Sequence, residues 1–143
     1  MDLWCWGKDA TKPRFLHAMI RVKDLDAAER FYIDGLGMKV LDRFDVESRR
    51  VSAIYIGFEG YAAGGVVELV SDWDAAGPFV HPTGYLHHFA IGVPDVAAMV
   101  AKLEALGAEV SLRPTIMKPG APAAAFVKDP DGYSIELIQT RQA

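Results

Sequence analysis

Cysteine is nearly absent from this 143-residue sequence, in which Cys5 is the only one. A single cysteine excludes an internal disulfide, so no covalent cross-link within the chain stabilises the fold. Chains without disulfides are typical of reducing compartments, and we expect a cytoplasmic protein. The first residues, MDLWCWGKDATKPRF, also lack the charged region and apolar run that a secretory signal peptide has.

Long apolar runs and an excess of basic residues are missing as well. No apolar run approaches the roughly 20 residues that span a bilayer. Lys and Arg number 15 against 19 for Asp and Glu, which gives a net charge of −4. Nucleic acids and anionic membranes bind clusters of positive charge, so we expect neither as a partner. The length and the 51% hydrophobic content indicate one globular domain with a sizeable core.

What the sequence does contain is a repeat of its own first half. At an offset of 71 positions, His17 aligns with His88, and four more identities follow in order. These are Ile20 with Ile91, Val22 with Val93, Asp24 with Asp95 and Ala27 with Ala98. The segment LGMKV (36–40) aligns with LGAEV (106–110) at an offset of 70, and VELV (67–70) with IELI (135–138) at 68. Small changes of offset are typical of insertions in surface loops, so the order of matches indicates duplication of one supersecondary unit.

Each copy is interpreted as a strand, a helix and three further strands. Asp24 and Asp95 are suited to capping the helices. Apolar residues then recur at helical spacing until Gly37 and Gly107, which we expect to end the helices. DPDG at 129–132 predicts a turn before the last strand. The expected strands are 15–22, 38–46, 51–58 and 65–70 in the first copy and 86–93, 108–113, 123–129 and 133–139 in the second.

The predicted fold class is α+β, built from two βαβββ modules in tandem with the helices on one face of a mostly antiparallel sheet. We expect an N-terminal extension over 1–14 and a first module over 15–75. A linker over 76–85 and a second module over 86–141 would follow.

The alternation of side chains along a strand decides between two adjacent histidines. His87 and His88 must point to opposite faces. The repeat selects His88, because it aligns with His17. The alternate apolar residues of both strands would pack against the helices, so these two histidines should face the concave side of the sheet. We expect His87 to support a ligand or face outward, and His81, in the linker, to be solvated.

Two glutamates are also matched by the repeat and by the alternation of side chains along a strand. Glu68 and Glu136 align by the repeat, and each stands between apolar residues in the middle of a strand. A carboxylate there is costly unless it is paired or coordinated. A single strand histidine or glutamate is most often structural, but the joint pattern, in register twice, favours a divalent-metal site of nitrogen and oxygen donors. Its four ligands would be His17, Glu68, His88 and Glu136.

Four segments resemble the signature segments of the glyoxalase I (lactoylglutathione lyase) family, which belongs to the vicinal oxygen chelate superfamily. They are HAMIRVKDLDAAERFYIDGLGMKVL, VVELVSDW, HHFAIGVPDV and AFVKDPDGYSIEL, and the resemblance runs from about Phe15 to Gln139. It implies that the paired modules form a curved half-barrel sheet with the helices outside. By this resemblance the four residues named above match the family's metal ligands one for one. The compact chain resembles the short bacterial form, which implies one Ni²⁺ or Co²⁺ per site, with Zn²⁺ as the alternative.

The resemblance also implies a lyase reaction on the hemithioacetal that methylglyoxal forms with glutathione. The product would be S-lactoylglutathione, reached through an enediolate that the divalent ion stabilises. A carboxylate must remove a proton and return it to the adjacent carbon. Glu136 matches the position assigned to this base, and Glu68 is its counterpart in the repeat.

Three further residues match, or depart from, positions that bind glutathione in the family. Arg21 lies four residues after His17 on the same strand face, about 13 Å away, and matches a glutathione-contacting arginine. Lys118 resembles a lysine of a flexible loop, and a solvated surface residue is the alternative for both cations. Asp72 stands where the family has an asparagine that contacts the γ-glutamyl end. An aspartate would repel a carboxylate and attract an ammonium, which leaves the identity of the thiol open.

The sequence leaves open whether a site is shared between two chains and which reaction the protein catalyses. The resemblance implies a homodimer in which each site takes His17 and Glu68 from one chain and the other two ligands from its partner, with pairing inside one chain as the alternative. Related folds serve iron-dependent ring-cleaving dioxygenases, epimerases of acyl-CoA esters and drug-sequestering proteins of the bleomycin-resistance type. Glu68, at a position where the dioxygenases use histidine, argues against the first of these. The role of the Trp4-Cys5-Trp6 extension stays open.

Overall fold

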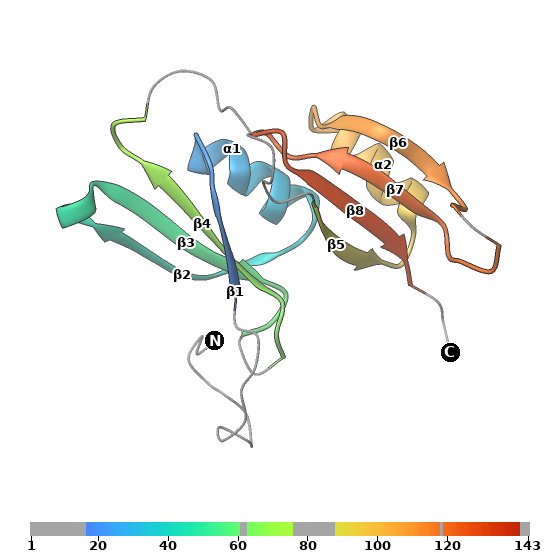
Figure 1. The fold of residues 1–143 in the computed structure, drawn as a ribbon, viewed down its shortest axis with the longest axis horizontal. Helices are drawn as coiled ribbons and strands as arrows, with labels where there is room; N and C mark the ends of the chain where they lie inside the picture. Colours follow the sequence, from blue (N-terminus) through green and yellow to red (C-terminus); the bar gives the residue numbers. More distant parts are fainter. Residues whose placement is uncertain (1–16, 61–62, 76–87, 118, 141–143) are drawn as a thin grey trace. The chain divides into compact units, whose positions relative to one another are not determined.

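The computed structural model describes residues 17–60, 63–75, 88–117 and 119–140, and the chain divides into two compact units, 1–78 and 79–143. The first unit contains β1 (His17–Arg21), α1 (Leu25–Glu29), η1 (Arg30–Gly35), β2 (Lys39–Val46), η2 (Glu47–Arg49), β3 (Val51–Gly57) and β4 (Val66–Asp72). The second contains β5 (His88–Val93), α2 (Val96–Ala105), β6 (Glu109–Thr115), β7 (Ala124–Lys128) and β8 (Ser134–Gln139). Each unit therefore follows the predicted order βαβββ (Figure 1).

Each unit contains one four-stranded sheet, and the two sheets have the same topology. The strand order is β1-β4-β3-β2 in the first and β5-β8-β7-β6 in the second. The first strand of each unit runs parallel to the last, and the other neighbours are antiparallel. This is the predicted α+β arrangement. It brings β1 beside β4 and β5 beside β8, although 40 residues or more separate the paired strands in the sequence (Figure 1).

Both helices begin and end at the residues that the sequence indicates. The carboxylates of Asp24 and Asp95 accept hydrogen bonds from backbone N–H groups of the first turn. Gly37 and Gly107 follow the helices with φ angles of 80° and 94°, which side chains with a Cβ rarely adopt. The helix boundaries are therefore set by local chemistry.

The first helix holds one more residue than the second. Its latter half, η1, is a π-helix in which the N–H of Leu36 donates to the carbonyl of Phe31, five residues back. Across this segment the offset of the repeat changes from 71 to 70. The expectation that such changes lie in surface loops is wrong here, because the wider π turn accommodates the extra residue within the helix.

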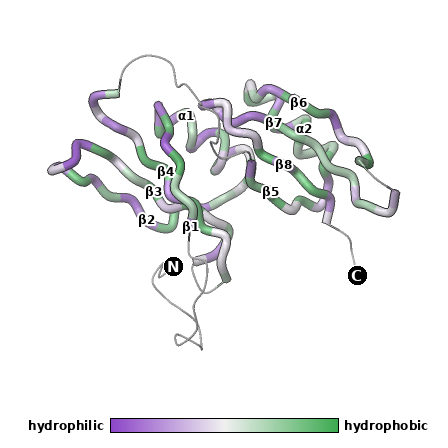
Figure 2. The backbone as a smooth tube through the Cα atoms, viewed as in Figure 1, coloured by the Kyte–Doolittle hydropathy of each residue, from purple (hydrophilic) through white to green (hydrophobic). Residues whose placement is uncertain are grey.

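Alternate strand residues form the core of each unit. On β1, Ile20 is 3% exposed, whereas Met19, on the opposite face, is 49% exposed. On β5, Ile91 and Val93 are buried in the same way. Figure 2 shows hydrophobic residues along the strands of both units, while the turn between β2 and β3 is hydrophilic. The apolar faces pack against the helices, and the opposite face of each sheet carries the predicted ligands.

The predicted boundaries of the two modules and of the segments that flank them are not tested by the structure. The N-terminal extension, 1–14, and the linker, 76–85, both lie outside the described residues. Within the described part of the chain, no helix is long and apolar enough to cross a membrane.

Candidate metal centre and substrate pocket

The first candidate pair lies on two parallel neighbouring strands. In the register of β1 with β4, His17 is opposite Val66, and its side chain reaches Glu68, two residues further on. The Nε2 atom of His17 lies 3.1 Å from Oε2 of Glu68. The side chains are 29% and 18% exposed, so both are partly buried and both keep some contact with solvent.

The second unit repeats this arrangement. His88 is opposite Ser134 in the register of β5 with β8, and it too reaches two residues further, to Glu136. The separation of Nε2 and Oε2 is again 3.1 Å, and the side chains are 33% and 15% exposed. The duplication seen in the sequence is therefore a duplication of one local geometry.

An aromatic ring from the middle of each sheet accompanies each imidazole. The ring of Tyr55 on β3 meets the His17 ring edge to face, with centroids 5.3 Å apart. The ring of Phe126 on β7 meets the His88 ring in the same way, also at 5.3 Å. Our sequence interpretation missed both aromatic residues. The signal was available, because Tyr55 and Phe126 align at an offset of 71.

The environment of Tyr55 affects its ionisation. Burial raises the pKa of the phenol, and the negative charges of Glu68 and Asp42 raise it further. Glu68 is the cross-strand neighbour of Tyr55. The phenol is therefore neutral at physiological pH and adds no charge beside the first His–Glu pair.

The donor atoms of each pair are spaced as neighbouring ligands of one ion. Imidazole nitrogen and carboxylate oxygen bind divalent metals at about 2.1 Å, so adjacent ligands lie about 3 Å apart. Both 3.1 Å separations fit this requirement. Among the described residues, no group of three or more His, Cys, Asp or Glu side chains is gathered for a metal. One pair supplies only half of a four-ligand set, so a complete site needs both pairs.

A pocket of about 380 Å³ opens on the first unit beside Glu68. Its walls are largely apolar, and Met19, Phe44 and Val70 contribute to them. Arg21 also lines it, and the guanidinium Nη1 of Arg21 forms an ion pair with Oδ2 of Asp72. The structure thus brings two of the predicted substrate-binding residues together.

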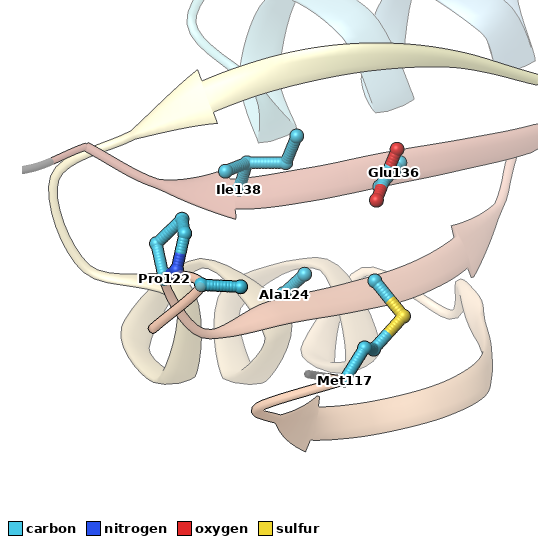
Figure 3. A pocket seen from close by; sticks show the side chains of 6 residues that line it. Met117, Pro122, Ala124, Glu136 and Ile138 are labelled. Atoms are coloured by element: carbon cyan, nitrogen blue, oxygen red, sulfur yellow. The ribbon is translucent and has the colours of Figure 1, made fainter. Parts of the chain in front are cut away.

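A second pocket, of about 320 Å³, opens on the second unit. It is lined by Met117, Ala121, Pro122, Ala124, Glu136 and Ile138. Figure 3 shows Glu136 at this pocket with the side chains of Met117, Pro122 and Ile138 around it. Glu136 is therefore a carboxylate in a mostly apolar environment. Such an environment suits a group that exchanges a proton with a substrate.

Several predicted residues lie outside the described part of the chain. Lys118 is one of them, and so are His81 and His87. The Trp4-Cys5-Trp6 extension is another. Their predicted roles remain predictions.

Comparison with known proteins agrees with the fold and with the sequence motifs. Residues 14–137 match the Glyoxalase/Bleomycin resistance protein/Dioxygenase superfamily. A lactoylglutathione lyase of Arabidopsis thaliana is 40% identical over 96% of this chain, and the match covers 48% of that relative. The chain thus spans about half the length of the plant relatives it matches.

Bacterial and protozoan relatives match over most of their own length. A lactoylglutathione lyase of Haemophilus influenzae is 36% identical over 90% of this chain and 93% of the relative. The solved structure of the trypanothione-dependent glyoxalase I of Leishmania major is 37% identical, with a TM-score of 0.77, over 90% of this chain and 87% of that chain. The chain belongs to the glyoxalase/bleomycin resistance protein/dioxygenase superfamily.

Proposed function

We propose that the chain is a metal-dependent lactoylglutathione lyase of the glyoxalase I type. Its substrate would be the hemithioacetal of methylglyoxal and glutathione, and its product S-lactoylglutathione. The observation that carries this proposal is the pair of identical His–Glu contacts, each 3.1 Å long, on equivalent strands of two repeated units. Relatives named lactoylglutathione lyase support it.

Four side chains would hold the metal ion: His17, Glu68, His88 and Glu136. Nitrogen and carboxylate donors suit Ni²⁺ and Co²⁺, and they also suit Zn²⁺. Of these we propose Ni²⁺ or Co²⁺. A divalent ion at this site lowers the free energy of the negative charge that develops on substrate oxygens as a carbon-bound proton leaves.

Glu136 is the proposed base. Its carboxylate takes the proton from the carbon that bears sulfur and a hydroxyl group, and returns it to the neighbouring carbonyl carbon. The hydroxyl proton passes to the oxygen of that neighbouring carbon, so the first carbon becomes the thioester carbonyl. The proton returns within the same substrate, so no external oxidant or reductant is needed. The apolar lining of the pocket around Glu136 limits the access of water, which keeps the transferred proton from exchanging with solvent.

The thiol part of the substrate would lie along the first unit. Arg21 is four residues beyond His17 on β1, about 13 Å along the strand. We propose that Arg21 and Asp72 contact the peptide part of the thiol and that Lys118 contributes from its loop. Glutathione belongs to reducing compartments, so we place the activity in the cytoplasm.

The proposed assembly is a homodimer. One ion needs a His–Glu pair of each kind, and in a two-fold dimer the first unit of one chain and the second unit of its partner supply them. A dimer built in this way has two equivalent sites.

The test combines turnover with metal analysis. The purified, Ni²⁺-loaded protein should convert methylglyoxal plus glutathione to a thioester, followed by its ultraviolet absorbance. Glu136→Gln should lower kcat by about 10²- to 10⁴-fold while a metal ion is still bound. Glu104→Gln, an exposed glutamate of the same unit, is the matched control and should keep full activity. Full turnover by the metal-loaded Glu136→Gln variant would refute the assignment of the base. An inactive, metal-free wild type that binds aromatic drugs would support a sequestering protein instead.

A further inference from the structure

Exposed methionines line both pockets. The sequence has five methionines, and the structure describes four of them. Met38 is 3% exposed and belongs to the core, and Met99 on α2 is partly buried. Met19 and Met117 are 49% and 53% exposed, and each lines one of the two pockets. Methionine is among the side chains most often buried, so its exposure at both pockets calls for an explanation.

The internal repeat does not account for these two positions. Met19 aligns with Ala90 at the offset of 71. Met117 aligns with Glu47 at an offset of 70 and with Val46 at 71. Neither methionine has a methionine counterpart in the other copy, so the duplication of the unit does not explain either of them.

Met117 forms the exposed wall of the pocket that contains the proposed base. It follows β6 in the chain, and Figure 3 shows its side chain extended toward β7, the strand of Ala124. Glu136 lines the same pocket from the neighbouring strand, β8. The Glu136 side chain is only 15% exposed, whereas Met117 is largely open to solvent. A small solute that enters the pocket therefore meets the thioether before it meets the carboxylate.

The thioether of an exposed methionine reacts with peroxides. Its sulfur donates an electron pair to one oxygen of hydrogen peroxide, so that an S–O bond forms and the O–O bond breaks. The sulfur is oxidised by two electrons, and the peroxide is reduced to water as the proton on the transferred oxygen passes to the departing hydroxide. The product is methionine sulfoxide, which methionine sulfoxide reductases convert back to the thioether.

A sulfoxide would change the character of this pocket. Among the described residues that line it, none offers a side-chain hydrogen-bond donor when Glu136 is ionised. A polar group stays hydrated unless a donor of the protein replaces the water, so the sulfoxide oxygen would keep water bound. That water would lie in the same pocket as the carboxylate, where the apolar lining otherwise limits it.

We propose that Met117 is a site of reversible oxidation by peroxides, and that its sulfoxide lowers turnover by admitting water to the pocket of the base. This inference rests on the proposed function, since it names a modification that controls the same site. Met19 does not share this role, because it lines the pocket of Glu68, which is not the proposed base.

The test treats the Ni²⁺-loaded full chain with hydrogen peroxide, removes the excess and measures turnover of the hemithioacetal in D₂O. Peptide mass spectrometry should show one added oxygen atom on Met117. Oxidation should lower kcat about three- to tenfold, as expected when a polar group enters an apolar site. Proton NMR should show more deuterium at the methine carbon of the lactoyl product, because the transferred proton then exchanges with solvent. Methionine sulfoxide reductases and a dithiol should reverse both effects.

Three variants provide the comparison, each measured against its own untreated form. Met117→Leu is apolar and has no sulfur at this position, so peroxide should leave its kcat and its deuterium fraction unchanged. Met99→Leu is the matched control, because it retains Met117, and it should respond to peroxide like the wild type. Met117→Gln has a polar side chain of similar length and should show a deuterium fraction above that of the wild type without any peroxide.

The outcomes separate this inference from the function on which it rests. An oxidised wild type that keeps its kcat and its deuterium fraction would overturn the inference and leave the lyase proposal intact. A loss of activity in peroxide-treated Met117→Leu as large as in the wild type would do the same, since the sensitive group would then lie elsewhere. A wild type that produces no thioester before treatment would refute the proposed function, and the inference about turnover would fall with it.

Discussion

At the scale of residues, a carboxylate and an aromatic ring both contact each imidazole. A carboxylate two positions beyond the register partner lies 3.1 Å from Nε2, and an aromatic ring packs edge to face with the imidazole at 5.3 Å. An edge-on ring limits rotation of the imidazole about its side-chain bonds. A ligand whose rotamer is already restricted loses less entropy when it binds a metal. We therefore assign Tyr55 and Phe126 a positioning role.

Replacing the ring of Tyr55 tests that role. Tyr55→Leu should weaken metal binding by about 2- to 12-fold, because edge-to-face aromatic contacts contribute about 0.5–1.5 kcal/mol. Tyr55→Phe retains the ring and should bind metal like the wild type. Competition with a chromophoric chelator gives the affinities. Equal weakening by both variants would show that the hydroxyl, and not the ring, is what matters.

At the scale of elements, the π-helical turn explains why the two copies differ in length. The N–H of Leu36 reaches back five residues to Phe31, so the turn contains one residue beyond an ordinary helical turn. The residues before and after the extra one keep their buried faces: Ala28, Phe31 and Leu36 are all 4% exposed or less. The extra residue thus leaves the packing of the helix unchanged.

Deleting one residue from each helix tests this account. Removal of the exposed Asp34 should convert the π turn into an α turn and cost about 1 kcal/mol or less, because the flanking residues keep their faces. Removal of the exposed Ala101 should cost more than about 3 kcal/mol, because it turns the buried Leu103 away from the sheet. Urea unfolding of both variants measures the difference. Similar losses in the two variants would contradict the account.

The contact between α2 and β6 contains an exposed ion pair with a clear pH signature. A hydrogen bond from Arg113 lowers the pKa of the Glu104 carboxyl, and the charge of Arg113 lowers it further. A group whose pKa is lowered on folding adds stability above its unfolded pKa and loses it as the pH falls through the folded value. The contribution of Glu104 is therefore present at neutral pH and disappears in acid.

Arg113→Met should return the pKa of Glu104 toward its ordinary value. A carbon-detected NMR titration of the carboxyl group measures the shift directly. The difference in stability between wild type and variant should be constant near neutral pH and vanish at acidic pH. An unchanged Glu104 titration in the variant would show that the ion pair does not form in solution.

At the scale of the whole molecule, the chain consists of two units, and each unit contains one His–Glu pair of proposed ligands. A four-ligand ion must therefore draw on two units, which come from one chain or from two. If the site is shared between two chains of a dimer, two inactive variants should complement each other, whereas a site within one chain would not allow this.

Mixing two inactive variants distinguishes the two arrangements. His17→Ala and His88→Ala should each lack activity as homodimers. If each site draws on both chains, a heterodimer has one site with neither histidine and one site with both. Unfolding the two variants together and refolding them should then restore about a quarter of wild-type activity, since random pairing makes half of the dimers mixed. No recovery, with wild type refolded as the control, would place both pairs of a site in one chain.

Much of this protein follows from local features of the sequence. The capping residues Asp24 and Asp95, the glycines after the helices and the turn at Asp129 act within a few residues, so their patterns predict the elements well. The internal repeat also identified the two histidines and the two glutamates as matched positions. A pattern that occurs twice carries information that neither copy has alone.

Other features needed the tertiary structure, because they depend on which strands pair and in which register. The parallel pairing of β1 with β4 and of β5 with β8 sets the 3.1 Å contacts, and nothing local to either strand specifies an offset of two residues. The same pairing joins Arg21 to Asp72, 51 positions away in the sequence. The sequence thus determined which residue types occur and on which face, since both follow from backbone geometry. Only the packed sheets decided which of them meet, because contacts between distant strands arise from burial of the whole core.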